Sequence, residues 1–152
     1  MRKGLNNEPH DNMIRKAKIT DVSEISALLG QLGYPVDERL IKEKLVLLND
    51  HADHELLAYE QNEKVIGFIS IHFVPQIAMT GDFANIAYFC VDENIRGKGV
   101  GAALLARAEE LVAERKCDRI FVHCNGHRID AHRFYERNGY TNSPKYYVKK
   151  FN

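Results

Sequence analysis

Residues Val91 to Leu105 read VDENIRGKGVGAALL. Three of the five residues from Gly97 to Gly101 are glycine, and an apolar pattern with helical spacing begins directly after them. Glycine at the start of a helix costs about 1 kcal/mol per residue relative to alanine. The pattern therefore indicates that a ligand or another part of the chain approaches this backbone closely.

A strand, a glycine turn and a helix in this order are typical of anion-binding sites. Amide N–H groups at a helix start lack intrahelical partners, and the helix dipole adds partial positive charge there. Arg96 and Lys98 add basic side chains, and the first helical turn carries no acidic residue. The stretch therefore predicts a site for a phosphate-like group.

Two other nucleotide motifs fit this stretch less well. GKGVGA matches the loose dinucleotide pattern G-x-G-x-x-A, but the following strand ends in Cys124–Asn125 where that motif expects an acidic residue. The P-loop pattern needs Ser or Thr after Gly97–Lys98, and Gly99 stands there. Tight packing between helix and strand is a third, purely structural explanation of the glycines.

The composition favours one globular domain in a reducing compartment. The chain has 152 residues, of which 45% are hydrophobic and 28% charged. No apolar run approaches the roughly 20 residues that a membrane span needs, and no secretory pattern opens the chain. Cys90, Cys117 and Cys124 are too few for a disulfide framework. We therefore expect a cytoplasmic protein without a membrane partner.

The net charge of zero is unevenly distributed along the chain. Residues 1–95 carry 9 basic and 15 acidic residues, a balance of −6, and residues 96–152 carry 12 and 6, a balance of +6. The basic half fits an anionic ligand, although an uneven spread of solvated charge explains it equally well. No dense basic patch is interleaved with aromatic residues, so a nucleic-acid partner is not expected.

The pattern of apolar residues predicts a mixed α/β domain over 13–152, after a polar, flexible extension over 1–12. Asp21 or Thr20 would cap the first helix and Asp130 the last one. In chain order we expect a strand over 13–19, helices over 20–33 and 37–48, strands over 55–61, 64–74 and 84–92, a helix from Val100, a strand over 119–125, a helix over 130–139 and a strand over 145–151.

Two segments resemble motifs of the GNAT superfamily of N-acetyltransferases. RGKGVG at 96–101 resembles the signature [Q/R]-x-x-G-x-[G/A], and AHRFYERNGY at 131–140 is similar to the family segment A-x-x-F-Y-x-x-x-G-[F/Y]. Their order and spacing match as well, and the resemblance covers residues 13–152. It implies a GNAT-like single domain with a central mixed, mostly antiparallel twisted sheet, flanking helices, and strands that splay at a coenzyme A cleft.

The resemblance also implies a co-substrate and the residues that hold it. In this family the signature amides hold the pyrophosphate of acetyl-coenzyme A, and the preceding strand pairs through its main chain with the pantetheine arm. Asn125 and Arg128 line the same cleft on a looser match. The implied coenzyme-binding residues are Cys90, Val91, Arg96, Gly97, Lys98, Gly99, Val100, Gly101, Ala102, Asn125 and Arg128.

The implied reaction is direct attack of a primary amine, on a small molecule or a peptide, on the thioester. Tyr135 matches the family's tyrosine acid, which protonates the departing thiolate. The strand ANIAYFCV carries no acidic residue to serve as general base, which leaves His72, His123, Glu60 or a water chain. The acceptor would enter over the first two helices and the hairpin side. A non-catalytic coenzyme A-binding or regulatory module is the alternative function, and a homodimer stays open.

Two sets of residues superficially resemble metal ligands. His51 and His54 lie in HADH, and Cys124, His127 and His132 lie near the predicted last helix. Neither set has a complete four-ligand spacing. We expect no metal cofactor.

Overall fold

The computed structural model describes residues 12–124, 128–143 and 147–151. They belong to two compact units, the first ending at Val122 and the second beginning at His123. Of the predicted extension over 1–12, only Asn12 lies within the described residues.

The order of elements confirms the predicted mixed α/β fold up to the last helix. Each helix and strand boundary of the first unit agrees with the sequence pattern to within a few residues. The elements of the first unit are β1 (Met13–Lys16), the 3₁₀ turn η1 (Ile19–Asp21), α1 (Val22–Leu32), α2 (Glu38–Asn49), β2 (His54–Gln61), β3 (Lys64–Val74), β4 (Phe83–Val91), α3 (Val100–Glu114) and β5 (Arg119–Val122). The second unit holds α4 (Ile129–Arg137).

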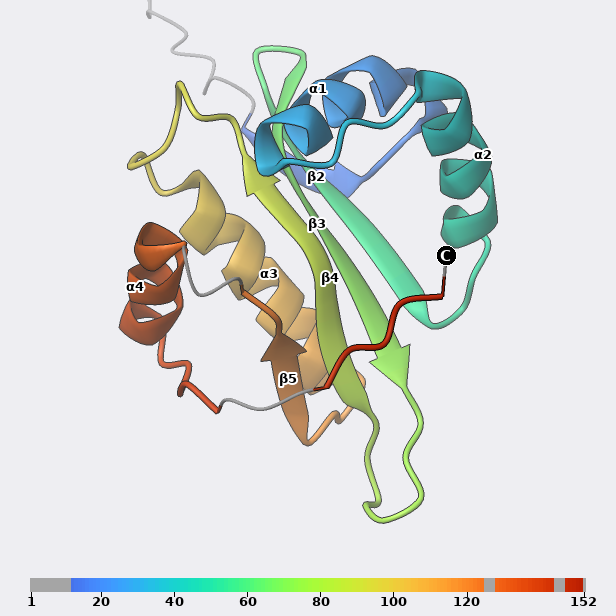
Figure 1. The fold of residues 1–152 in the computed structure, drawn as a ribbon, viewed down its shortest axis with the longest axis vertical. Coiled ribbons are helices and arrows are strands. Elements are labelled where there is room, and N and C mark those ends of the chain that lie inside the picture. The colour runs from blue at the N-terminus through green and yellow to red at the C-terminus, as the bar shows by residue number, and fades with distance from the viewer. Residues whose placement is uncertain (1–11, 125–127, 144–146, 152) are drawn as a thin grey trace, which may run out of the picture. The chain divides into compact units, whose positions relative to one another are not determined.

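The five strands form one sheet in the order β1-β2-β3-β4-β5. The pairs from β1 to β4 are antiparallel, and β5 joins β4 in parallel (Figure 1). The β4–β5 register runs from Phe83–Arg119 to Ile86–Val122, whereas β4 continues to Val91. The pairing of β3 with β4 skips Ala87, which therefore forms a β-bulge. This bulge directly follows Ile86, the last residue of β4 that pairs with β5.

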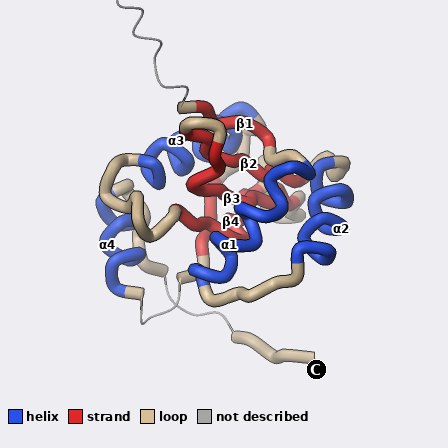
Figure 2. Tube along the Cα trace, turned by 90° about the horizontal axis from the view of Figure 1, so that it is seen from above, coloured by secondary structure: helices blue, strands red, loops and turns tan. Residues whose placement is uncertain are grey.

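Helices cover both faces of the sheet in the first unit. Helices α1 and α2 lie on one face and α3 on the other (Figures 1 and 2). Ile25 and Leu28 of α1, at helical spacing, enter a core with Ile41 and Leu45 of α2. The sheet contributes Leu56, Ala58, Val65, Phe68 and Cys90 to the same core.

The ends of α1 and α2 follow the turn residues in the sequence. Helix α1 ends at Gly33, which has a φ of +97°, and Tyr34 N–H donates to the Leu29 carbonyl at 2.8 Å. Helix α2 begins after Asp37, whose carboxylate accepts from Arg39 N–H at 2.7 Å. Both signals were correctly predicted.

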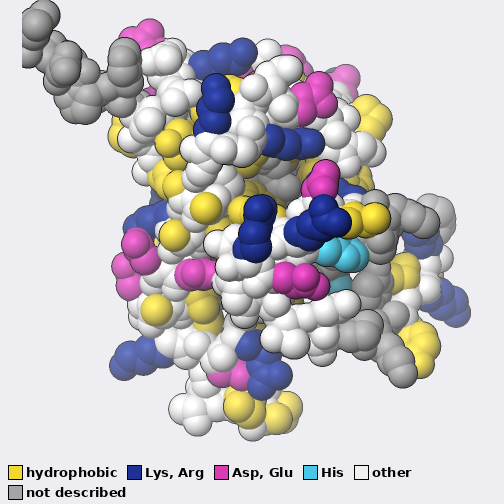
Figure 3. Space-filling view, turned by 90° about the vertical axis from the view of Figure 1, so that its left-hand side faces the viewer, with side chains coloured by type: hydrophobic (Ala, Val, Ile, Leu, Met, Phe, Trp, Pro, Cys, Tyr) yellow, Lys and Arg dark blue, Asp and Glu magenta, His cyan; other side chains and the backbone are white. Residues whose placement is uncertain are grey.

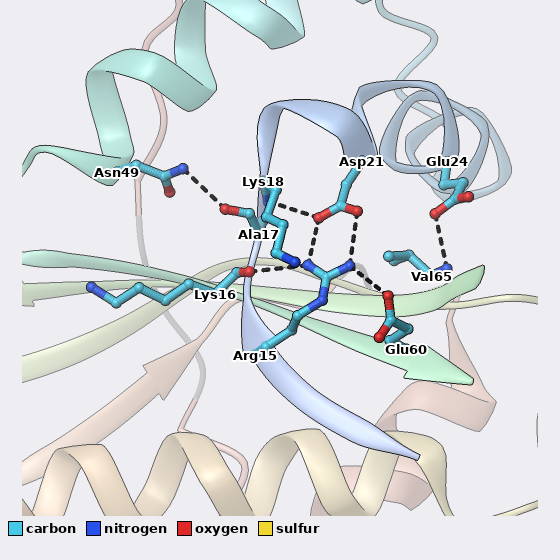
Figure 4. Close-up of polar contacts among 9 residues, drawn as sticks. All are labelled: Arg15, Lys16, Ala17, Lys18, Asp21, Glu24, Asn49, Glu60 and Val65. Carbon is cyan, nitrogen blue, oxygen red and sulfur yellow. Dashed lines mark hydrogen bonds and ion pairs between the residues drawn. The ribbon is translucent and has the colours of Figure 1, made fainter. Parts of the chain in front are cut away.

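Asp21 precedes α1 as predicted, but its carboxylate does not cap that helix. It accepts two hydrogen bonds from Arg15, at 2.7 and 3.0 Å, and one from Lys18 N–H at 2.7 Å (Figure 4). Arg15 also donates to Glu60 at 3.0 Å. Burial alone would raise the pKa of Asp21, but the bonds from Arg15 and Lys18 outweigh it and hold that pKa below its usual value. This cluster fixes β1 to η1 and β2.

Two predictions for the C-terminal part are wrong. Helix α4 begins after Arg128, and Asp130 lies within its first turn without forming a cap. The strand expected over 145–151 is not formed by residues 147–151, and 145–146 lie outside the described residues. Tyr147 is 97% exposed and Phe151 81%. A run of aromatic and β-branched residues alone does not make a strand, because a strand also needs a neighbour and a buried face.

Candidate active site

The glycine turn adopts a backbone that only glycine accepts easily. Gly97 and Gly99 have φ values of +85° and +83°, and Gly99 is the N-cap of α3. The first helical bond runs from Ala103 N–H to the Gly99 carbonyl at 3.0 Å. Within the described residues, the amides of 99–102 donate no hydrogen bond. Four N–H groups at a helix start, with no acidic residue in the first turn, suit an anionic group.

Gly67 on β3 sets how closely α3 approaches the sheet. A Cβ there would lie 3.1 Å from Leu104 Cδ1 and 3.2 Å from the Cys90 carbonyl oxygen. Val100 and Leu104 are buried against this strand. The role of Gly67 was not predicted from the sequence, although an isolated glycine inside a strand pattern is a known signal of close approach.

Hydrogen bonds hold the segment between β4 and the turn in place. Asp92 N–H donates to the Ile66 carbonyl at 2.8 Å, and Glu93 N–H to Gln31 Oε1 of α1 at 2.9 Å. Arg96 Nε donates to the Val91 carbonyl at 3.2 Å. Strand β3 and helix α1 therefore fix the turn at the end of β4, and Arg96 joins the two predicted parts of the coenzyme site.

The other predicted coenzyme residues are placed as follows. The Cys90 thiol is buried and donates to the Leu28 carbonyl at 3.3 Å, so this side chain faces α1. Lys98 is exposed at the turn. Arg128 is the N-cap of α4 in the second unit. Asn125 lies outside the described residues.

Tyr135 lies in the last turn of α4 and is half-buried. Its ring makes an edge contact with Phe134, with centroids 5.3 Å apart, and lies 5.6 Å from Tyr140. Burial raises the pKa of the Tyr135 phenol above its ordinary value, and Cys124 adds to the increase. The phenol is therefore protonated at neutral pH, the state that a proton donor needs.

The three candidate bases differ in their surroundings. Glu60, on β2, accepts a hydrogen bond from Arg15 of β1. Strand β3 lies between β2 and β4, so Glu60 is two strand spacings of about 4.8 Å each from β4. His123 is exposed directly after β5. His72 is half-buried on β3, with its ring centroid 4.5 Å from that of His54. Of the three, only His72 lies within a strand that pairs with β4.

Two tyrosines meet on the α1 side of β4. Tyr34, in the connection between α1 and α2, packs edge to face on Tyr88 with centroids 5.4 Å apart. They are 53% and 42% exposed, so both rings keep a solvent-facing surface. This contact joins the two helices of the predicted acceptor side to the bulged strand.

The described residues offer no evident metal site. Within the described ranges, no three His, Cys, Asp or Glu side chains are placed to hold a metal ion, and His127 lies outside these ranges. None of the described helices is long and apolar enough to cross a bilayer. On the face shown in Figure 3, basic and acidic side chains are interspersed.

The fold and the glycine turn define a class of protein: a mixed α/β domain with a glycine turn and, among the described residues, unpaired amide groups between strand β4 and helix α3. The family model described as "Acetyltransferase (GNAT) family" matches residues 23–140. The chain belongs to this family, as its two motifs predict.

Individual relatives support the same assignment. The chain is 31% identical over 132 residues to an aminoalkylphosphonate N-acetyltransferase of Salmonella typhimurium, covering 86% of this chain and 85% of the relative. A GNAT family acetyltransferase of Staphylococcus aureus is 25% identical, with a TM-score of 0.77 over 91% of this chain and 98% of that one. A transcriptional regulator from Bacillus halodurans C-125 shares the fold, with a TM-score of 0.84 at 23% identity over 92% and 99%. The family model and the Salmonella relative support acetyl transfer, and the two solved structures share the fold.

Proposed function

We propose that this protein transfers an acetyl group from acetyl-coenzyme A to a primary amine of a small molecule or a peptide, within an acetyltransferase domain over 13–152. The proposal rests on the four amide N–H groups at 99–102, which donate no hydrogen bond within the described residues and lie in the turn that follows β4. A pyrophosphate would accept hydrogen bonds from them, and Lys98 would add positive charge.

The pantetheine arm would run from the glycine turn along β4. In this proposal the main chain of Cys90 and Val91 pairs with the arm, as the family resemblance implies. The continuation of β4 beyond its last pair with β5 supports this path. Asn125 and Arg128 are proposed to line the same cleft. The thioester then lies farther along β4, toward the bulge at Ala87.

The proposed reaction is a single displacement at the thioester. The lone pair of a neutral amine attacks the carbonyl carbon, the carbon–sulfur bond breaks, and an amide forms. The coenzyme A thiolate takes a proton from the Tyr135 phenol, whose raised pKa keeps it protonated until then. The nitrogen loses its extra proton as the amide forms, and a proton passed through water restores the Tyr135 phenol. A second group must first remove a proton from the acceptor's ammonium.

The acceptor class is supported by charge and by one relative. Residues 1–95, which contain the proposed acceptor side, carry a balance of −6, which favours a cationic amine. The name of the Salmonella relative gives its acceptor as an aminoalkylphosphonate, which carries an amine and a phosphonate on one alkyl chain. Short aminoalkylphosphonates, simple alkylamines and peptide amines therefore form the panel of acceptors to test. The contact of Tyr34 with Tyr88 would form one wall of this region.

Coenzyme binding tests the first half of the proposal. Gly101→Val, in the first turn of α3, should weaken acetyl-coenzyme A binding by at least about tenfold in calorimetry, because its side chain would occupy the place of the phosphates. Gly99→Val should do the same, with added backbone strain from its positive φ. Ala106→Val, at an exposed position farther along α3, is the matched control. Unchanged affinity in Gly101→Val would refute the site.

Turnover on the acceptor panel tests the second half. Acetylated product, identified by mass spectrometry, should appear with at least one primary amine and match the coenzyme A released. Dephospho-coenzyme A should bind nearly as well as coenzyme A, since the turn addresses the pyrophosphate. Binding without turnover on any amine would favour the non-catalytic module.

A further inference from the structure

Four polar side chains form a row across three strands, on the sheet face that α1 and α2 cover in part. They are His54 on β2, Ser70 and His72 on β3, and Asn85 on β4. His54 is the cross-strand partner of His72, and His72 that of Asn85. Directly opposed residues point to the same face, with Cβ atoms about 4.5–5.5 Å apart. His54 and Ser70 are two of the three buried polar residues in the part of the chain that the structure describes.

The first part of the row is rigid. His54 Nε2 and Ser70 Oγ are hydrogen-bonded at 2.8 Å, and the two residues are only 4% and 5% exposed. The His54 ring in turn lies against the His72 ring, with centroids 4.5 Å apart. The His72 ring forms no hydrogen bond within the described residues, so its nitrogens remain available to another molecule.

The second part of the row contains an unsatisfied acceptor. Asn85 Oδ1 is buried and has no hydrogen-bond partner in the described part of the chain. Leaving a buried acceptor unpaired costs about 1–3 kcal/mol, so a donor from a bound molecule would recover that energy. An ammonium or amine group has the required N–H donors.

The position of the row along β4 matches the place of the thioester. Asn85 is two residues before Ala87, a distance of about 7 Å at the usual strand rise. It lies on the far side of the bulge from Val91 and the glycine turn. A coenzyme arm running from the turn toward Ala87 would present its acetyl group near this row. This step rests on the proposed function.

We propose that His72 is the general base of the reaction, that Asn85 Oδ1 accepts a second hydrogen bond from the acceptor's ammonium, and that His54 is a positioning residue for the His72 ring. A His72 nitrogen takes one proton from the ammonium, and the nitrogen lone pair freed by this step attacks the thioester carbonyl. The imidazolium then returns its proton to water after the amide has formed.

The surroundings of His72 suit this role. Burial, and to a lesser extent His51, lower the pKa of His72 below its ordinary value, so the ring is neutral and able to accept a proton at neutral pH. The titratable groups that face it are His54 from β2 and His51 from the turn before β2. Its partner on β4, Asn85, carries no charge.

The test compares His72→Gln with the full-length wild type on the best acceptor from the panel. We expect kcat/KM to fall about 10²–10⁴-fold, the usual contribution of a general base, with unchanged acetyl-coenzyme A affinity. The acid limb of the pH profile should disappear. An acceptor that is already neutral at pH 7, such as hydroxylamine, should lose far less. Asn85→Ala should raise KM about tenfold and keep the shape of the pH profile.

His51→Gln is the comparison variant: it should keep the rate at the pH optimum and move the acid limb slightly to higher pH, because His51 helps to lower the pKa of His72. If His72→Gln keeps the wild-type kcat/KM and pH profile while the wild type acetylates the amine, the base is another group and only this inference fails. An equal loss on ionised and neutral acceptors would also overturn it, because a structural defect does not distinguish them. If the wild type acetylates no amine, the proposed function fails, and the role of His72 fails with it.

Discussion

His54 should make the stability of the protein depend on pH well above the range where carboxylates titrate. Burial is the main cause that lowers its pKa, followed by the neighbouring His72, and together they bring it to about 4, from 6.5 for an ordinary histidine. Between these two values the unfolded chain binds a proton that the folded chain excludes. Stability is therefore complete above pH 6.5 and falls as the pH decreases toward 4.

The size of the effect follows from the difference in pKa. A difference of about 2.5 units corresponds to about 3 kcal/mol when fully developed, and about 2 kcal/mol of it is lost by pH 5. With a urea slope near 2 kcal/mol per molar for a domain of this size, the midpoint of unfolding should fall by about 1 M between pH 7 and pH 5. His72, whose pKa is also lowered, adds to the loss in the same window.

The assay is urea unfolding followed by circular dichroism at several pH values from 7 to 4.5. This range avoids most of the titration of Asp21, whose pKa is lowered from 3.8. His54→Gln should be less stable at pH 7, because Ser70 loses its partner, but its midpoint should change much less with pH. His51→Gln should reduce the wild-type slope only slightly, because His51 is the smallest of the causes that lower the pKa of His54. The reasoning is refuted if His54→Gln shows the full wild-type slope.

Three substitutions test other parts of the structure. Gly67→Val should lower stability by about 1–3 kcal/mol in urea unfolding, because its side chain would meet Leu104 of α3. Asp21→Asn should cost about 3 kcal/mol, because it leaves the largely buried Arg15 without its bidentate partner. Tyr135→Phe should lower kcat about 10- to 1,000-fold and leave acetyl-coenzyme A affinity unchanged, because only the proposed acid is removed.

Each of these variants has a control elsewhere in the chain. Gly30→Ala has open space around its new Cβ and should stabilise α1 by up to about 1 kcal/mol, the opposite sign from Gly67→Val. Lys16→Met removes an exposed ion pair and should change stability by less than about 0.5 kcal/mol. Tyr140→Phe should keep most of the activity. Comparable effects in variant and control would contradict the corresponding explanation.

The sequence predicted the elements whose signals are local. Gly33 and Asp37 end and begin helices through their own backbone and side chain, so their positions could be assigned from neighbouring residues. The segment over 145–151 is rich in aromatic and β-branched residues, yet residues 147–151 form no strand. Whether a strand forms depends on a partner that its own residues do not specify.

The candidate site was predictable in its glycine turn but not in its polar row. The turn is contiguous, and the cost of three glycines marks it. The row of His54, His72 and Asn85 exists only through the registers of β2, β3 and β4, with a bulge at Ala87. A shift by one residue would send each side chain to the other face, and the sequence pattern does not place bulges.

The order of strands in the sheet has a consequence for how the chain folds. Strands β1 to β4 lie in the order in which they occur along the chain, and the hairpins β2–β3 and β3–β4 close over short loops. The parallel pair is different, because Phe83 meets Arg119 only after α3 has crossed between the two strands. Closing this longer loop costs more chain entropy, so we expect the antiparallel meander to fold first. During synthesis, the meander would emerge and collapse around α1 and α2 before the ribosome has released β5.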